Sequence, residues 1–343
     1  MKLTETKIAL STLLENQTFG DYAVLVNYDG EEIFLSSEKV DRYSYFDVAS
    51  MGKVLITTTL ILRAVGENKI SLQSRLPEFF SDVPAALQNV TVQHLLTHTS
   101  GIVRFEFPNT AKNYDREQLA AMILSNPPAF APETNMQYSC NGFILLGMIA
   151  EKVWDDSFEN LFERFIRVPL GLVRSCCRID VDEPNAVIGY NRENHQGQRF
   201  DDHNVRIMDR AVGSGGQFWC VHDIDTFLSA VANRDSRLYH PSLFSAAEQD
   251  YTPNYTEGRG LGWLYVDSRY PQTGRLFEEG SFGHCGHTGM SMFISKSRRL
   301  RVIIATNATR YANIKNQFHG YDYGHTMKMR EIVHNAIYDD LFR

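Results

Sequence analysis

Apolar and polar positions follow two different rhythms along the chain, one typical of helices and one typical of strands. Apolar residues recur at helical spacing in residues 2–15, 50–66, 90–96, 115–154 (with a proline-interrupted loop at 127–132) and 330–342. Runs rich in apolar and β-branched residues, which favour strands, occur at residues 22–28, 32–36, 260–266, 290–294 and 301–306. Asp29-Gly30, between the first two of these runs, is a strong hairpin signal. Residues 180–209 are polar without such a rhythm, so we expect a surface excursion there.

The order of these segments predicts the fold class. Strand signals lie towards both ends of the chain and helical signals lie between them, which favours a mixed α/β (α+β) fold with one sheet built from both ends. We expect residues 1–65 and 236–343 to form an α/β subdomain. Residues 66–235 would be an inserted, mainly helical subdomain, and the two would form one functional domain.

Composition and charge narrow the class of partner. The chain has 34 Lys and Arg against 41 Asp and Glu, a net charge of −7, whereas nucleic-acid-binding surfaces usually carry a basic excess. One dense basic cluster lies between two apolar runs, where we expect a solvated hairpin turn; its members are Lys296, Arg298, Arg299 and Arg301. We therefore expect no nucleic-acid partner. The sequence indicates nothing about oligomeric state.

Cysteine use and the start of the chain bear on location. The chain has 5 cysteines, an odd number, and Cys176 and Cys177 are adjacent, which argues against a disulfide framework. The first residues carry charges where a signal peptide needs an apolar core. No run approaches the roughly eighteen apolar residues that span a bilayer. We expect a cytoplasmic protein with reduced thiols and no membrane partner.

The sharpest chemical feature is Ser50-Met51-Gly52-Lys53, at the start of the helix predicted over 50–66. Residues three apart lie on one helix face with Cβ atoms about 5–6 Å apart, so Ser50 and Lys53 should be neighbours. A desolvated lysine loses its proton readily and can then accept one from a hydroxyl. Ser-x-x-Lys also recurs by chance in long chains, so the tetrapeptide alone carries little weight.

Further motifs follow in a fixed order. They are FDVASMGK at 46–53, TVQHLLTHTSG at 91–101, QYSCNGFILLG at 137–147, PLGL at 169–172, GGQF at 215–218, GLGW at 260–263 and GHTG at 286–289. Together they resemble the serine β-lactamase and penicillin-binding-protein-like superfamily, including class C β-lactamase-related hydrolases and esterases. The resemblance implies an antiparallel sheet flanked by N- and C-terminal helices, with the site between the sheet and the inserted helices. No cofactor is implied.

The resemblance also implies roles for individual residues. Ser50 would be the acylated nucleophile, and Lys53 would accept its proton or tune the group that does. Tyr138 would share the base role and protonate the leaving group, and a phenol with an ordinary pKa near 10 needs a cationic neighbour for this. Lys53 would supply that charge, helped by His287 when it is protonated.

The third catalytic element of the family is placed at His287-Thr288-Gly289, directly before the apolar run from Met290. The oxyanion hole would consist of the backbone N–H groups of Ser50 and Met290. Gly289 would let the backbone lie close to the substrate, where a Cβ has little room. A second register, His284-Cys285-Gly286, is the rival.

Two positions depart from the family pattern. Cys140 stands where the second element has an asparagine, with Asn141 one position later, and a thiol is a poor substitute for an amide in hydrogen bonding. His287 stands where β-lactamases and many D,D-peptidases carry lysine, so a fixed charge for a substrate carboxylate is missing from that position. Both departures point away from efficient antibiotic hydrolysis and leave acyl transfer intact.

Some histidine groupings imitate metal sites. His94 and His98 are four residues apart without the glutamate of a zinc-protease motif, so we interpret them as structural. Cys285 with His284 and His287 resembles a zinc cluster, but side chains of a strand alternate between its faces. We expect no metal.

The sequence therefore predicts a serine hydrolase that acts through an acyl-enzyme on a small ester, amide or β-lactam, with an ester preferred. A D-amino-acid peptidase or weak β-lactamase is the alternative with the same chemistry. A catalytically silent ligand-binding protein is the alternative from another class, and the presence of Ser50, Lys53, Tyr138 and His287 together argues against it.

Overall fold

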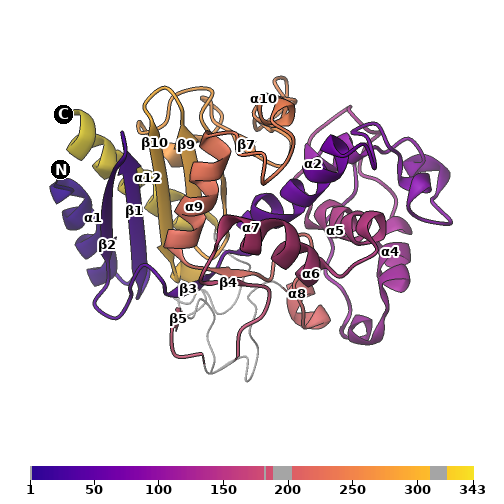
Figure 1. Ribbon diagram of the computed structural model, residues 1–343, viewed down its shortest axis with the longest axis horizontal. Helices are drawn as coiled ribbons and strands as arrows, with labels where there is room; N and C mark the ends of the chain where they lie inside the picture. The colour runs from indigo at the N-terminus through magenta and orange to yellow at the C-terminus, as the bar shows by residue number, and fades with distance from the viewer. Residues whose placement is uncertain (1, 181–182, 188–202, 310–322) are drawn as a thin grey trace.

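A six-stranded antiparallel sheet forms one side of the molecule (Figure 1). The computed structural model describes residues 2–180, 183–187, 203–309 and 323–343. The strand order β2-β1-β10-β9-β8-β7 brings the two ends of the chain together, which confirms the expected sheet. The strands are β1 Tyr22–Tyr28, β2 Glu31–Ser36, β7 Leu264–Tyr265, β8 Phe282–Cys285, β9 Ser291–Ser295 and β10 Leu300–Thr306.

The hairpin between β1 and β2 turns where the sequence pattern indicated. Tyr28 pairs with Glu31, so Asp29 and Gly30 form the loop. Their φ angles are 53° and 88°, and the type I′ turn of such hairpins needs positive φ at both positions. This local preference sets the register of the first hairpin and decides which face each β1 side chain takes.

Helices cover both faces of the sheet (Figure 1). Helices α1 (Thr4–Glu15) and α12 (Tyr323–Phe342) pack against each other on one face, and α9 (Val221–Ala232) packs on the other. Side chains of β1 alternate accordingly, with Val24 and Val26 in the core under α1 and α12. The sheet is thus buried on both sides, as the sequence-based fold class requires.

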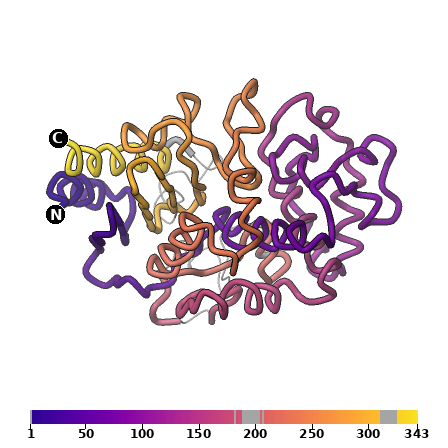
Figure 2. The backbone as a smooth tube through the Cα atoms, turned by 45° about the horizontal axis from the view of Figure 1, so that its top comes forward, coloured from indigo at the N-terminus to yellow at the C-terminus, as the bar shows by residue number. Residues whose placement is uncertain are grey.

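The two ends of the chain are joined by a helix cap. The Asp340 carboxylate accepts hydrogen bonds from the backbone N–H groups of Glu5 (2.9 Å) and Thr6 (2.8 Å) in the first turn of α1. A carboxylate at a helix N-terminus accepts hydrogen bonds from N–H groups that have no partner within the helix. Its negative charge also interacts favourably with the positive end of the helix dipole. Figure 2 shows the two termini side by side.

The rest of the molecule is mainly helical and lies to one side of the sheet (Figure 1). Its α-helices are α2 Thr59–Gly66, α3 Val92–Leu96, α4 Arg116–Leu124, α5 Cys140–Trp154, α6 Phe158–Phe162, α7 Val168–Leu170, α8 His203–Met208 and α10 Ser242–Ala247. Single-turn and π-helical pieces are η1 Ala49–Met51, η2 Lys53–Thr58, η3 Leu76–Glu78, η4 Ala85–Leu87, η5 Asn109–Asn113, η6 Glu163–Arg167 and η7 Pro271–Thr273.

A second, small sheet connects the two parts. Its strand order is β4-β6-β3-β5, with β3 Tyr45–Asp47, β4 Ser175–Cys176, β5 Ala186–Val187 and β6 Phe218–Trp219. The sequence pattern did not predict it, because strands of two or three residues are too short to show alternation. β3 leads directly into the segment that carries Ser50.

One helix bears on the predicted division of the chain. α9 lies within residues 66–235, the segment predicted to be inserted, yet it packs on β1 and β10 of the large sheet. The division at residues 65 and 236 otherwise stays a prediction.

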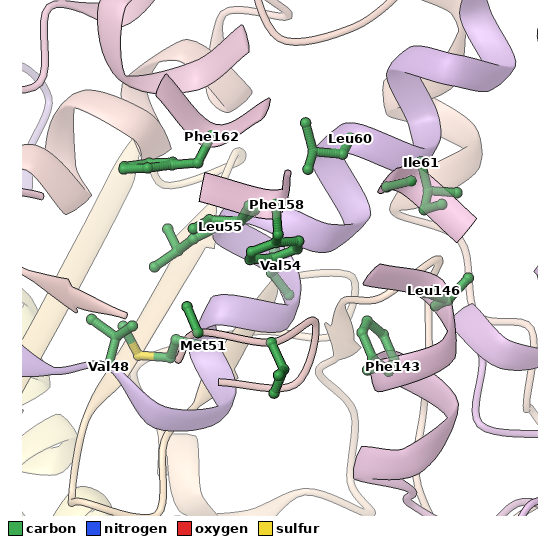
Figure 3. Close-up of a cluster of buried hydrophobic side chains, with 14 of the residues drawn as sticks. Val48, Met51, Val54, Leu55, Leu60, Ile61, Phe143, Leu146, Phe158 and Phe162 are labelled. Carbon is green, nitrogen blue, oxygen red and sulfur yellow. The ribbon is translucent and has the colours of Figure 1, made fainter. Parts of the chain in front are cut away.

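The segment Ala49–Gly66 runs through the centre of the molecule. Apolar side chains from α5 and α6, including Phe143 and Phe158, surround it (Figure 3). Its 18 residues are long and apolar enough to cross a membrane by composition alone, which differs from the sequence-based expectation. Because 78% of this stretch is buried inside the protein, the core helix of a folded domain explains its composition.

Candidate active site

Ser50 lies on a strained turn at the start of this central segment. Ala49, directly before it, has a φ of 48°, in the left-handed region that residues with a Cβ rarely adopt. The Asp47 carboxylate accepts a hydrogen bond from the Ala49 N–H at 2.8 Å and holds the turn. Such strain clusters where a side chain must be aimed at a site. The turn leaves Ser50 half-buried at the edge of a cavity.

Lys53 is the neighbour that the Ser-x-x-Lys spacing predicts. Its side chain is completely buried. The Nζ atom lies 2.9 Å from Ser50 Oγ, 2.9 Å from the carbonyl oxygen of Ser214 and 3.5 Å from Cys140 Sγ. The lysine therefore connects η1, the start of α5 and the loop around Ser214.

That loop, residues 212–217, accepts hydrogen bonds from the Ser50 segment at several points. Val48 N–H donates to the carbonyl of Gln217 (3.1 Å), and the Thr57 hydroxyl donates to the carbonyl of Gly213 (2.7 Å). With the Lys53–Ser214 bond, these contacts fix the position of the whole turn. The sequence motif at 215–218 pointed to only part of this loop.

Tyr138 reaches the same place from the loop before α5. Ser139 caps α5 by accepting a hydrogen bond from Gly142 N–H (3.3 Å), which fixes where the helix begins. His98 Nδ1 accepts the Ser139 N–H (3.1 Å), and the His98 ring packs on the Tyr138 ring with centroids 4.5 Å apart. Lys53 Nζ lies 5.1 Å from the centroid of the same ring.

The electrostatics around Tyr138 divide into opposing effects. Burial is the largest effect and leaves the pKa of Tyr138 above its ordinary value, although the charge of Lys53 and hydrogen bonds with Lys53 and Ser50 lower it. Burial also lowers the pKa of His98 and that of His284 well below the usual range. Both imidazoles are therefore neutral at pH 7, and the charge beside Tyr138 comes from other side chains.

Cys140 occupies the position that the motif register assigned to it, beside Lys53. Asn141 does not replace the missing amide, because its Nδ2 donates to the carbonyl of Val103 (3.1 Å) and its Oδ1 accepts from Asn204 (3.4 Å). Asn204 was expected on the surface with its neighbours 202 and 203. Instead it is buried and accepts the N–H of Phe107 at 2.7 Å, while residue 202 lies outside the described residues.

The structure places the rival string, His284-Cys285-Gly286, at the end of β8 and against the Ser50 turn. β8 ends at Cys285, and Gly286 to Met290 form the turn into β9, closed by a hydrogen bond from Gly286 N–H to the Met290 carbonyl (2.9 Å). A Cβ on Gly286 would lie 2.6 Å from the carbonyl oxygen of Val48, so this glycine is the one against the Ser50 turn. His284-Cys285-Gly286 is therefore the string beside the nucleophile.

The three residues expected to contact the substrate, Thr288, Gly289 and Met290, pack inside the protein instead. Thr288 is buried and donates to the carbonyl of Asp47 (2.9 Å). Gly289 has a φ of 104° and faces Thr306, where a Cβ would be 2.0 Å from the hydroxyl oxygen. Met290 is fully buried, and none of these three residues lines the cavity at Ser50, whereas His287 does.

A cavity of about 360 Å³ opens at Ser50. The predicted site residues Tyr138, Cys140 and His287 line it. His284 of the rival register lines it as well. The cavity also contains charged and polar side chains that no motif indicated, namely Arg104, Glu257, Arg259, Gln272 and Arg330. Of these, only Arg259 stands next to a motif, because it directly precedes Gly260-Leu261-Gly262-Trp263. That position was the one feature of the sequence that could have indicated Arg259 as a site residue.

Two of these residues are buried cations. Arg259 Nη2 donates to Glu257 (2.6 Å). Arg330 on α12 donates to Gln272 Oε1 (2.6 Å) and to the carbonyl of Gly286. Arg259 and Arg330 are each about 3% exposed. The floor of the cavity is therefore more positive than the chain as a whole.

The histidine pairs have structural partners. His94 closes a capping box with Thr91 at the start of α3, and its Nε2 lies 2.8 Å from Glu133. His98 accepts the Ser139 N–H. Within the described residues, no three His, Cys, Asp or Glu side chains converge as a metal site would require.

Comparisons with known proteins identify similar sequences and a shared fold. The sequence model of the Beta-lactamase family matches residues 9–317. An N-acetylmuramyl-L-alanine amidase of Bacillus subtilis is 24% identical over 322 residues, covering 83% of this chain and 73% of the relative. Esterase EstB of Burkholderia gladioli is 25% identical over 307 residues, covering 76% and 77%. A class C β-lactamase structure from Rhodobacter sphaeroides superposes with a TM-score of 0.73 at 17% identity, covering 96% and 99%, and shows the same fold.

Proposed function

This chain belongs to the Beta-lactamase family, whose members are serine hydrolases, and from that premise we propose that it cleaves small carboxylic esters through an acyl-enzyme on Ser50. One observation carries the proposal: Lys53 Nζ lies within hydrogen-bond distance of both Ser50 Oγ (2.9 Å) and Cys140 Sγ (3.5 Å). The contact with Ser50 activates the hydroxyl as a nucleophile. The contact with Cys140 puts a thiol where an asparagine amide would orient amide substrates.

The proposed reaction has two steps. Ser50 Oγ attacks the ester carbonyl carbon, its proton passes to Tyr138, and the bond to the alcohol breaks as Tyr138 returns the proton to the leaving oxygen. Water then attacks the acyl-enzyme, and the same groups carry its proton back to Ser50. Tyr138 is suited to both transfers because it lies between Lys53 and the cavity.

Lys53 is proposed to act as an ammonium ion rather than as the base. An ammonium has three donors and no acceptor, and Nζ faces an acceptor on Ser50, on Ser214 and on Cys140. Its charge favours the phenolate of Tyr138, which then takes the serine proton. The candidate oxyanion donors are the backbone N–H of Ser50 and that of His287, the residue after Gly286, in place of Met290.

A peptidase or weak β-lactamase remains the second candidate. The observation in its favour is the pair of buried guanidiniums, Arg259 and Arg330, because guanidinium is the preferred partner of a carboxylate. Against it, Cys140 is a poor partner for a substrate amide. A cytoplasmic location is also part of the proposal, supported by five free thiols of which two are adjacent.

The test compares two substrates in one protein. Initial acylation rates are measured for a nitrophenyl acetate or butyrate and for a chromogenic cephalosporin, in the wild type and in Ser50→Ala. We expect the ester to react faster than the cephalosporin and both reactions to vanish in the variant. If the wild type turned over the cephalosporin faster than the ester, the esterase proposal would be wrong and the second candidate function would take its place.

A further inference from the structure

Arg259 lies against the face of the Tyr138 ring. Its Cζ is 5.2 Å from the ring centroid, within the range of a cation–π contact. The residue is 3% exposed, and its Nη2 is paired with Glu257 Oε1 at 2.6 Å. Nε and Nη1 of the same guanidinium are buried and have no hydrogen-bond partner in the described part of the chain. The charge of Arg259 therefore faces Tyr138, and among the described residues Glu257 is the carboxylate that pairs with it.

The groups that face Tyr138 come from five elements. Lys53 comes from η2, Cys140 from α5, His98 from the loop after α3, His284 from β8, and Arg259 with Glu257 from the loop before β7. Arg330 and Arg104 line the same cavity. Burial lowers the pKa of both histidines well below the usual range, so they are neutral at pH 7. Among the described residues, Lys53 and Arg259 are therefore the cations that lie over the Tyr138 ring.

Arg259 keeps its charge in this position. Burial works against the charge, but the ion pair with Glu257 and the nearby phenol hold the pKa of Arg259 above its ordinary value. His284, on the strand beside the nucleophile, supplies no charge of its own. The Arg259 guanidinium is thus a permanent cation beside Tyr138, whereas the His284 imidazole on β8 is neutral.

We propose that Arg259 is a positioning residue for acylation, whose guanidinium orients Tyr138 and stabilises its phenolate, with Glu257 setting the strength of that effect. The proposal rests on the proposed function. Arg259 itself gives up no proton: the proton of Ser50 Oγ moves to the phenolate oxygen and from there to the leaving group. Neutralising Arg259 therefore makes the phenolate harder to form, and neutralising Glu257 makes it easier.

The experiment measures the rate at which a fluorophosphonate modifies Ser50 as a function of pH. In Arg259→Gln we expect the acidic limb of this profile to move up by about one pH unit, the size of shift that a lost neighbouring charge produces. In Glu257→Gln the limb should move down. Arg259→Lys, which keeps a charge, should restore most of the wild-type profile.

A matched control is available in a second, partly buried ion pair. Arg301 on β10 pairs with Asp225 on α9 (2.7 Å), outside the cavity, and Arg301→Gln should leave the limb in place. Shifts of opposite sign at 259 and 257 support the proposal. The proposal would be overturned if both variants were labelled more slowly with the acidic limb of the pH profile unchanged. Shifts of the limb in the same direction in both variants would also overturn it. If Arg259→Gln does not fold, the sign at Glu257→Gln decides alone. A wild type whose Ser50 is never labelled contradicts the proposed function instead.

Discussion

Lys53 contacts two residues with different proposed roles, the nucleophile Ser50 and Cys140, which bears on substrate preference. Ser50 Oγ receives one of its hydrogen bonds and Cys140 Sγ receives another. Both were predicted from the sequence as members of motifs. Tyr138 was predicted in the same way, and the structure adds its surroundings: two neutral histidines and the buried Arg259. These contacts join residues far apart in the chain, so no local pattern could reveal them.

Removal of the Tyr138 hydroxyl tests its role as the base. Tyr138→Phe should slow acylation of Ser50 by roughly 10²–10⁴-fold, the usual span for a general acid–base group. Nitrophenyl ester hydrolysis at several pH values measures this. Tyr43→Phe, at an exposed tyrosine, is the matched control and should behave as wild type. A Tyr138→Phe enzyme within a few-fold of wild type would show that another group takes the proton.

Cys140 predicts substrate preference. Cys140→Asn restores an amide that can bridge Lys53 and the acylamino group of a peptide or penicillin. We expect the rate for a cephalosporin, relative to a nitrophenyl ester, to rise about tenfold, which corresponds to roughly 1.4 kcal/mol. Cys140→Ala controls for loss of the thiol alone and should not change this ratio. An unchanged ratio in Cys140→Asn would mean that residue 140 does not contact the substrate.

At the scale of elements, glycines determine how closely the pieces of the site approach. α5 and the loop at 212–217 touch backbone to backbone: a Cβ on Gly213 would lie 2.0 Å from the carbonyl oxygen of Phe143. A carbonyl in a helix cannot swing aside as a flexible side chain can. This contact positions Ser214, whose carbonyl accepts a hydrogen bond from Lys53.

Gly213→Ala should therefore destabilise the fold by about 1–3 kcal/mol, the usual cost of overpacking. Urea unfolding measures it. The control is Gly142→Ala on α5, where the nearest atom is an ordinary 3.5 Å away and alanine favours the helix. Equal stability of the two variants would contradict the close approach.

The elements also show what local sequence can and cannot predict. The hairpin at Asp29-Gly30 and the amphipathic helix α1 were predicted because turn chemistry and periodicity are local. The sequence analysis preferred His287-Thr288-Gly289 as the third element, whereas the structure places the string three residues earlier against the Ser50 turn. His284-Cys285-Gly286 and His287-Thr288-Gly289 look alike as strings, and only the packing of Gly286 against the Val48 carbonyl distinguishes them.

At the scale of the whole molecule, buried neutral histidines make stability depend on pH. His334 on α12 packs against Phe277 and Phe293, and its ring nitrogen Nδ1 donates to the carbonyl of Gln272 (2.8 Å). Burial lowers its pKa to about 4. The unfolded chain takes up this proton near pH 6.5 and the folded chain does not, so stability is lost as pH falls from about 6.5 towards 4.

The expected loss from His334 is about 3 kcal/mol at 1.36 kcal/mol for each pKa unit. Urea unfolding between pH 7 and pH 4 measures it, and His334→Gln, which keeps the donor to Gln272, should show a shallower fall. Carboxylates contribute equally to both proteins, so the difference in slope isolates the histidine. Identical slopes would mean that His334 becomes protonated in the folded protein near its ordinary pKa.

The chemistry proposed for the molecule depends on one covalent bond at Ser50. The most direct measurement is the intact mass of the wild type and of Ser50→Ala after exposure to a fluorophosphonate. The wild type should gain the mass of one phosphonyl group, and the variant should gain none. No adduct on the wild type, or the same adduct on Ser50→Ala, would contradict a serine hydrolase that acts through Ser50.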